Sequence, residues 1–402
     1  MAGGSDPARI VLVGPASPAA LAAKLTGQAR ANAQEVNGLG GVPVNSLALG
    51  LLEAGRQVEV VTLAPDVPEP VEFASANLRV LVAPYRSSAR ARAADGYRAE
   101  RRHVADLLKR TDGELLHANW TYEFALACES DSRPVLVTAH DAPLTVLRRM
   151  PSAYRALRTL VAYRARFGIH RLSAVSPYLA SQWRREMLWR GPITVIPNIV
   201  DQLPPRASKG PGTRIGSVVV DVASGGPLKN VTRLLEAFAG VRAQLPDTEL
   251  RLIGPALDPL GETAVQAKAR GWAEGVLFLG PLSRQTLVQH LHEADVFVHP
   301  SVEESFALSI AEAMTCGVPV VAGSRSGAVG WTIGNGDAGL LVDVTNPSAI
   351  ESAVLQVLRD AELAKRLGAA GARRARTAFG SEVVTAAYLS WYEAAMLRHV
   401  AA

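Results

Sequence analysis

The sequence is poor in cysteine and lacks a long hydrophobic run, and each absence argues against a class of protein. Cys128 and Cys316 are the only cysteines and lie far apart, so we expect no disulfide framework and no cysteine-rich metal site. The sequence has no stretch of 18 apolar residues, so we expect no membrane-spanning helix. The first residues lack the basic and apolar regions of a secretory signal, and we therefore expect a cytoplasmic protein.

Two further patterns are missing. No Asp-x-Asp triplet occurs, so nothing indicates a pair of carboxylates on a metal ion, and we expect neither a metal nor a cofactor. No Gly-x-Gly-x-x-Gly follows the predicted strands 10–13 and 215–222, which argues against a nicotinamide-dependent dehydrogenase.

The net charge of +5 comes from arginines concentrated in residues 86–110 and 148–190. A basic protein can bind nucleic acid, but these arginines alternate with apolar positions at helical spacing. No basic segment is interleaved with aromatic residues that would stack on bases. The pattern favours solvated helix faces over a nucleic-acid partner, and leaves a peripheral membrane contact open.

The length of 402 residues suits two domains. Strand 10–13, a glycine loop, helix 46–54 and strand 58–63 form a βαβ unit, typical of a doubly wound sheet. Residues 14–35 are predicted to be loop-like. Prolines and glycines in 202–212 indicate a domain boundary.

Residues 298–321 are predicted to form a strand, a loop, a helix over 306–314 and a second strand. Glu304 precedes this helix and Glu312 lies on it, so the two carboxylates are about two turns apart and suited to two ends of one ligand. Free backbone N–H groups at the helix start favour an anion. Alternatively, the negative charge of Glu304 only stabilises the helix through its dipole, and Glu312 is a surface residue.

Polar residues also follow or end two strands of the first half. His117 and Asn119 end strand 115–119, and His140 and Asp141 follow strand 135–138. Ligands of parallel sheets bind beyond the carboxyl ends of the strands. These residues are therefore candidates for a binding site, although a histidine is often only a satisfied polar residue of the core.

The order Pro-Ser-x-x-Glu-x-Phe-x-Leu-x-x-x-Glu-Ala-Met-x-x-Gly-x-Pro-Val-Val, from Pro300 to Val321, resembles the Glu-x7-Glu signature of the retaining glycosyltransferases of family 4. The resemblance implies that Glu304 touches the donor sugar and Glu312 the ribose, while backbone N–H groups from 306 to 308 bind the diphosphate.

Other segments resemble the same family. Val-Thr-Ala-His-Asp resembles its Thr-x-His-Asp, and residues 224–230 resemble its phosphate loop, with Lys229 matching the lysine and Ser224 in place of the arginine. The resemblance implies the following site: Glu304 and His140 as catalytic residues; Gly40, Gly41, Gly225, Lys229, Asn230, Ser305, Phe306, Ala307, Leu308 and Glu312 as donor-binding residues; and His117, Asn119 and Asp141 on the acceptor side.

The resemblance implies an α/β protein with two facing Rossmann-like domains, the B-type glycosyltransferase architecture. Residues 1–205 with the C-terminal helix 380–402 would bind the acceptor, and residues 206–379 the nucleotide sugar. The implied reaction transfers a sugar from a UDP- or GDP-sugar to an acceptor, without metal and with anomeric retention. The alternatives are a nucleotide-sugar epimerase and a non-catalytic nucleotide-binding protein of the same fold.

Overall fold

The computed structural model describes residues 9–203, 217–221 and 226–400. The chain divides into two compact units: unit 1 comprises Met1–Ile199 and Ser381–Ala402, and unit 2 comprises Val200–Gly380. The sequence analysis placed this boundary at 205/206, a few residues further along the chain. Most of the proposed linker, from residue 204 onward, lies outside the described residues.

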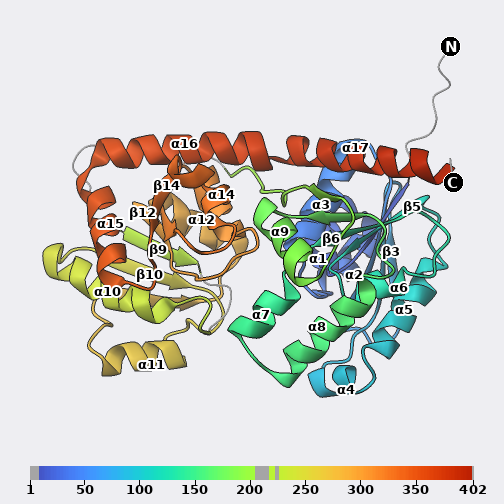
Figure 1. Cartoon of the computed structure of the whole chain (residues 1–402), viewed down its shortest axis with the longest axis horizontal. Helices are drawn as coiled ribbons and strands as arrows, with labels where there is room; N and C mark the ends of the chain where they lie inside the picture. The colour runs from blue at the N-terminus through green and yellow to red at the C-terminus, as the bar shows by residue number, and fades with distance from the viewer. Residues whose placement is uncertain (1–8, 204–216, 222–225, 401–402) are drawn as a thin grey trace, which may run out of the picture. The chain divides into compact units, whose positions relative to one another are not determined.

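In the described part of unit 1, eight strands form one sheet in the order β3-β4-β2-β1-β5-β6-β7-β8. Figure 1 labels β3, β5 and β6 of this sheet. Neighbouring strands are parallel, except that β3 is antiparallel to β4. The strands are β1 Ile10–Val13, β2 Val58–Ala64, β3 Val71–Ala74, β4 Leu78–Pro84, β5 Leu115–Asn119, β6 Val135–Ala139, β7 Leu172–Ala174 and β8 Ile193–Val195.

Along the sequence, the helices of unit 1 lie between these strands. The exception is the last helix, α17, which comes from the end of the chain and contacts α3. They are α1 Pro18–Leu21, η1 Ala22–Lys24, α2 Gly27–Gln34, α3 Val42–Glu53, α4 Ala89–Ala94, α5 Arg98–Leu108, α6 Glu123–Ala127, α7 Pro143–Arg149, α8 Ala153–Ala165, α9 Pro177–Glu186 and α17 Ser381–Val400.

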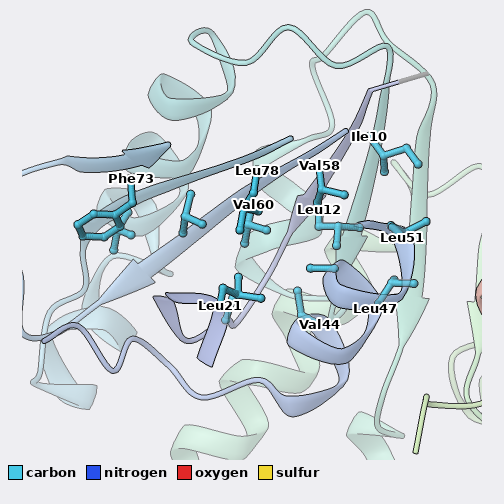
Figure 2. Close-up of a cluster of buried hydrophobic side chains, with 14 of the residues drawn as sticks. Ile10, Leu12, Leu21, Val44, Leu47, Leu51, Val58, Val60, Phe73 and Leu78 are labelled. Carbon is cyan, nitrogen blue, oxygen red and sulfur yellow. The ribbon is translucent and has the colours of Figure 1, made fainter. Parts of the chain in front are cut away.

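The core of unit 1 follows from alternation along the strands. Successive side chains of a strand point to opposite faces, so Leu12 and Val60 share one face and meet Val44 and Leu47 of α3 (Figure 2). All four residues of β1 are buried. Such a strand is covered on both faces, as expected for the middle of a doubly wound sheet.

Residues 14–35 correct the sequence analysis, which expected a loop. The segment contains α1, η1 and α2. Ser17 caps α1 by accepting a hydrogen bond from the backbone N–H of Ala20, and Pro18 opens the helix. A serine followed by a proline is a helix-start signal, which the alanine-rich composition obscured.

The arginine-rich segments agree with the prediction in one place and differ in another. The helix that the sequence predicts near 96–109 is confirmed as α5, and the shorter α4 precedes it; Gly96 and Tyr97, both with positive φ, separate the two helices. On α8, Arg158 does not lie on a solvated face. Its side chain is only 16% exposed and is 3.7 Å from the carboxylate of Glu123.

In the described part of unit 2, six parallel strands form a sheet in the order β11-β10-β9-β12-β13-β14. They are β9 Ser217–Asp221, β10 Glu249–Ile253, β11 Val276–Gly280, β12 Val296–His299, β13 Val320–Gly323 and β14 Gly339–Val342. The helical segments are α10 Val231–Gln244, α11 Glu262–Ala269, α12 Arg284–Glu293, α13 Leu308–Thr315, α14 Val329–Thr332, η2 Gly334–Gly336, α15 Pro347–Arg359 and α16 Ala361–Phe379.

Helix α13 begins at Leu308, two residues later than the sequence predicted. Ala307, the residue before it, has φ 65° and ψ 63°, in the left-handed region. This conformation is uncommon for a residue other than glycine. The chain therefore turns sharply between Glu304 and the first turn of the helix.

Among the described residues, the structure contains no helix whose length and apolar character would let it cross a membrane.

Candidate functional site

In unit 2, Glu304 accepts hydrogen bonds from two basic side chains. Lys229 Nζ lies 2.7 Å and His299 Nε2 3.0 Å from the same oxygen, Glu304 Oε1. Lys229 precedes α10 and His299 ends β12, so the fold brings three separate segments together. Lys229 and Glu304 are both among the predicted site residues, whereas His299 is not.

Opposing effects act on the Glu304 carboxyl. Burial favours its neutral form, but the hydrogen bond and charge of His299 and the charge of Lys229 outweigh burial and lower its pKa to about 2. Glu304 is therefore a carboxylate at neutral pH. Its charge is balanced by the lysine that the sequence assigned to a phosphate.

The segment after Glu304 presents the start of α13. The backbone N–H of Ala328 donates to Glu304 O, and Thr332 Oγ1 donates to Phe306 O. These bonds hold the loop by its carbonyl groups. The first N–H groups of a helix have no partner within the helix, so the amides at Ala307 and Leu308 are suited to an anion. Ser305, half-buried, lies between Glu304 and this turn.

Trp331 stands where the family often has a glutamate, and the structure gives it a packing role. Its ring lies 6.2 Å from that of Phe306 and 5.6 Å from that of Phe379, centroid to centroid. Phe306 is buried by these contacts. The aromatic cluster therefore supports the loop between Glu304 and α13.

Glu312 is buried, contrary to the alternative of a surface residue, and pairs with Arg284 at 2.6 Å. Arg284 also lies 3.0 Å from Asp201. One carboxylate oxygen of Glu312 is thus bonded to an arginine that also has a second acidic partner. A ligand hydroxyl at Glu312 would meet a charge-balanced, partly enclosed carboxylate.

Asn230 has a structural task in the phosphate loop. Its φ of 53° is left-handed, and its side-chain amide donates to Pro300 O at 3.1 Å and Val344 O at 2.7 Å. These bonds fix the start of α10 and so the position of Lys229. Gly225, also a predicted donor-binding residue, and Ser224 lie outside the described residues.

In unit 1, the predicted glycine pair precedes α3. Gly40 and Gly41 have φ of 77° and 71°. A Cβ on Gly41 would lie 1.8 Å from Pro15 O, whereas a Cβ on Gly40 would meet no atom within 4 Å. Asn45 of α3 fixes the loop, because its side chain donates to Gly40 O and accepts from the N–H of Ser17.

His140 is held by Asn119, as the predicted position at the strand ends suggested. His140 Nε2 lies 3.0 Å from Asn119 Oδ1, and the amide nitrogen of Asn119 donates to His117 O at 3.5 Å. Burial lowers the pKa of His140 to about 4. The neutral ring therefore donates from Nε2 and keeps a lone pair on Nδ1.

His117 corrects the prediction of an acceptor-side residue. It is fully buried, and its ring nitrogens lie 2.7 Å from Tyr392 Oη and 2.7 Å from Thr138 Oγ1. Both nitrogens are therefore occupied within the protein. Burial, with a small effect from His140, lowers the pKa of His117 to about 3. His117 links β5 and β6 to α17 and has no atom free for a ligand.

The lowered pKa values of His117 and His140 predict that acid destabilises the protein. Below their ordinary pKa of 6.5, the two histidines bind protons more readily in the unfolded chain than in the folded chain. Stability present above pH 6.5 is then lost as the pH falls, by about 1.4 kcal/mol per pH unit for each histidine. Urea unfolding from pH 7 to pH 5 measures this slope. His117→Gln should reduce it, whereas replacing the exposed His170 by glutamine should not; equal slopes in all three proteins would contradict the assignment.

Asp141 lies beside His140 but has a different environment. Its Oδ2 accepts a hydrogen bond from Tyr122 Oη at 2.8 Å, while Oδ1 is buried and has no hydrogen-bond partner. Burial raises the pKa of Asp141 against the opposing charge of Arg158. The orphaned oxygen is the kind of group that a ligand would satisfy.

The part of the chain that the structure describes has no evident metal-binding site. Residues 9–203, 217–221 and 226–400 contain no cluster of three histidine, cysteine, aspartate or glutamate side chains able to hold an ion. Each unit therefore has its own group of candidate residues: Glu304, Lys229 and the start of α13 in unit 2, and His140, Asn119 and Asp141 in unit 1.

The sequence matches two family models that together span most of the chain. Residues 40–202 match Glycosyltransferase Family 4, and residues 216–374 match Glycosyl transferases group 1. The chain belongs to the glycosyltransferases of family 4. The predicted resemblance is confirmed, and the two matches correspond to the two units of the structure.

Curated relatives of this glycosyltransferase share parts of its sequence. D-inositol 3-phosphate glycosyltransferase of Jonesia denitrificans is 34% identical over 44% of this chain and 43% of that protein. N-acetyl-alpha-D-glucosaminyl L-malate synthase of Bacillus anthracis is 26% identical over 72% of this chain and 77% of that protein. The match thus spans less than half the length of the first relative.

Solved structures give the fold. Sucrose-phosphate synthase from Thermosynechococcus elongatus has a TM-score of 0.76 at 20% identity, over 97% of this chain and 100% of that one. Anabaena HepE, solved with UDP and glucose, has a TM-score of 0.68 at 19% identity, over 96% and 99%. The B-type glycosyltransferase fold with two Rossmann-like units is therefore confirmed.

Proposed function

We propose that this protein transfers a sugar from a UDP- or GDP-sugar to an acceptor hydroxyl, with anomeric retention and without a metal ion. The observation that carries the proposal is the ion pair between Lys229 and Glu304 beside the start of α13. A cation, free amides and an ionised carboxylate within one loop region suit the diphosphate and the sugar of such a donor.

The donor nucleotides are chosen from the relatives. One relative is a GDP-mannose-dependent mannosyltransferase of Mycolicibacterium smegmatis, and Anabaena HepE was solved with UDP. The sequence relative and the structural neighbour make UDP and GDP the first nucleotides to test.

In the proposed reaction, the acceptor oxygen bonds to the anomeric carbon as the bond to the diphosphate oxygen breaks. The acceptor proton passes to the departing phosphate. Negative charge grows on the diphosphate, where Lys229 and the amides of residues 306–308 stabilise it. Binding the diphosphate draws Lys229 from Glu304, whose carboxylate then accepts hydrogen bonds from the sugar hydroxyls.

The remaining predicted residues position the substrates. Glu312, buried and paired with Arg284, would accept hydrogen bonds from the ribose. His140, neutral with a lone pair on Nδ1, would accept a hydrogen bond from a sugar hydroxyl and carries no charge against the diphosphate. Gly40 and Gly41 would let the backbone approach the ligand closely.

Thermal unfolding with UDP, GDP, ADP, TDP or NAD tests the donor site. A nucleotide at 100 times its dissociation constant should add about 2.7 kcal/mol of stability, and we expect this with UDP or GDP. Glu312→Ala should weaken that nucleotide about tenfold, a loss typical of a charged hydrogen bond. The control Glu236→Ala removes a carboxylate from the outer side of α10 and should change nothing.

The possible outcomes separate the alternatives. No stabilisation by any nucleoside diphosphate would contradict the proposal. Stabilisation without turnover of the matching nucleotide sugar, in the presence of acceptors, would indicate a nucleotide-binding protein of the same fold. Conversion of the donor sugar without transfer would indicate an epimerase.

A further inference from the structure

We propose that a cavity within unit 1 binds the acceptor and selects an uncharged ring compound that carries a hydroxyl group. The inference rests on the proposed sugar transfer and adds the chemical class of the acceptor. It differs from what the relatives' names state, since those name an inositol phosphate and malate as acceptors, which are anions.

The cavity has a volume of about 380 Å³ and aromatic walls. Tyr85, Trp120, Tyr122, Phe124 and Tyr154 contribute rings to its lining. This size is near the lower end of small-molecule sites, which span about 300–1,000 Å³. Apolar walls of this kind favour a ring system that buries its faces.

Trp120 has the backbone strain of a functional position. Its φ is 74°, in the left-handed region, and its N–H donates to Thr138 O at 3.0 Å. This conformation is an outlier for a bulky residue, and such outliers cluster at active sites and ligand clamps. Trp120 is 36% exposed, and the Arg158 guanidinium carbon lies 6.0 Å from its ring centroid, so the ring is partly accessible to a ligand.

Two carboxyl groups line the same cavity. Asp141 Oδ1 and Glu123 Oε2 are buried without a hydrogen-bond partner. Burial raises the pKa of both groups, and the charge of Arg158 opposes that rise and so favours their ionised forms. A hydroxyl group of a ligand would satisfy Asp141 Oδ1 by donating a hydrogen bond to it. A phosphate or carboxylate would instead place one of its own acceptor oxygens against Asp141 Oδ1, and no hydrogen bond would form.

The buried cation of the cavity is already engaged. The Arg158 guanidinium lies 3.7 Å from the centroid of the Tyr122 ring, 3.7 Å from Glu123 Oε2, and donates to Tyr97 Oη at 3.3 Å. Its charge is therefore matched by Glu123. The other basic lining residue, Arg155, donates to Ser152 Oγ on the exposed side, so the buried cation of the cavity is the one that already has an acidic partner.

The cavity adjoins the residues assigned to the reaction in unit 1. Trp120 directly follows Asn119, Asp141 directly follows His140, and Leu39 of the lining directly precedes Gly40. The carboxyl group that would accept the ligand hydroxyl therefore belongs to the residue that directly follows His140 in the chain.

Binding of 2-naphthol and of 2-naphthyl phosphate to the full chain, measured by calorimetry without nucleotide, tests the inference. The two probes share a ring system and differ in charge. We expect 2-naphthol to bind at least tenfold more tightly. Trp120→Ala and Asp141→Asn should each weaken it about tenfold, and Phe167→Ala, at an exposed aromatic residue of unit 1, should not change it.

Three results would overturn the inference: no binding of 2-naphthol at millimolar concentration, equal or tighter binding of the phosphate, or unchanged affinity in both cavity variants. A cooperative thermal unfolding transition without nucleotide shows that a variant is folded. Because the probes are measured without nucleotide, failure of the donor panel leaves their result readable, and a working donor site with no probe binding refutes only the acceptor class.

Discussion

Replacing Glu304 by glutamine is expected to lower the transfer rate about a hundredfold or more, the loss found when one electrostatic group is removed from a transition-state site. Glutamine keeps the shape of the side chain but carries no charge. His299 and Lys229 would then face a neutral amide instead of a carboxylate whose pKa they hold near 2. Nucleotide affinity should change less than threefold, because the proposed contacts of Glu304 are with the sugar.

The measurement is kcat with a saturating donor, together with the dissociation constant of the nucleoside diphosphate. Lys229→Met gives the opposite signature, since it removes the cation assigned to the phosphates and should weaken nucleotide binding. Glu236→Gln is the control for a carboxylate of unit 2 outside the site. A Glu304→Gln enzyme with wild-type turnover would remove Glu304 from the reaction.

The local arrangement of Glu304 and Glu312 could be predicted largely from one continuous stretch. Glu304 and Glu312 lie eight positions apart, and their spacing on a loop and a helix is a local property. The contact between Lys229 and Glu304 is not local, because 75 positions separate them, and only the family resemblance indicated it. His299 was missed because a histidine inside a predicted buried strand gives no sign of which segment it faces.

Unit 1 shows where local patterns mislead. His117 and Asn119 end the same strand two positions apart, and the sequence treated them alike. The partner of His117 is Tyr392, 275 positions away on α17, so the core role of His117 depends on a helix from the other end of the chain. The cavity likewise joins Leu39, Trp120 and Tyr154, which no spacing rule connects.

The glycine loop was predicted from its place before a helix, but the sequence could not distinguish its two glycines. Both have positive φ, and they differ in what surrounds them. Gly41 lies against the Pro15 carbonyl, whereas Gly40 has open space where a Cβ would be. The structure therefore supplies a matched pair of variants in which backbone strain is shared and steric overlap is not.

Gly41→Ala is expected to lower the free energy of unfolding by about 2–5 kcal/mol, from about 1–2 kcal/mol for a left-handed alanine and about 1–3 kcal/mol for overpacking. Gly40→Ala shares only the first cost and should lose about 1–2 kcal/mol. Urea unfolding monitored by circular dichroism measures both. Because the overlap at Gly41 is with backbone, relief requires the loop at residues 14–17 or the start of α3 to move.

That movement has a second consequence. Asn45 ties Gly40 O to the N–H of Ser17, so a shift at Gly41 disturbs the loop whose Leu39 lines the cavity. Gly41→Ala should therefore weaken 2-naphthol as well as stability, whereas Gly40→Ala should leave 2-naphthol affinity within about threefold. Equal losses in the two variants would mean that the left-handed backbone, and not the approach to Pro15, is what this loop requires of glycine.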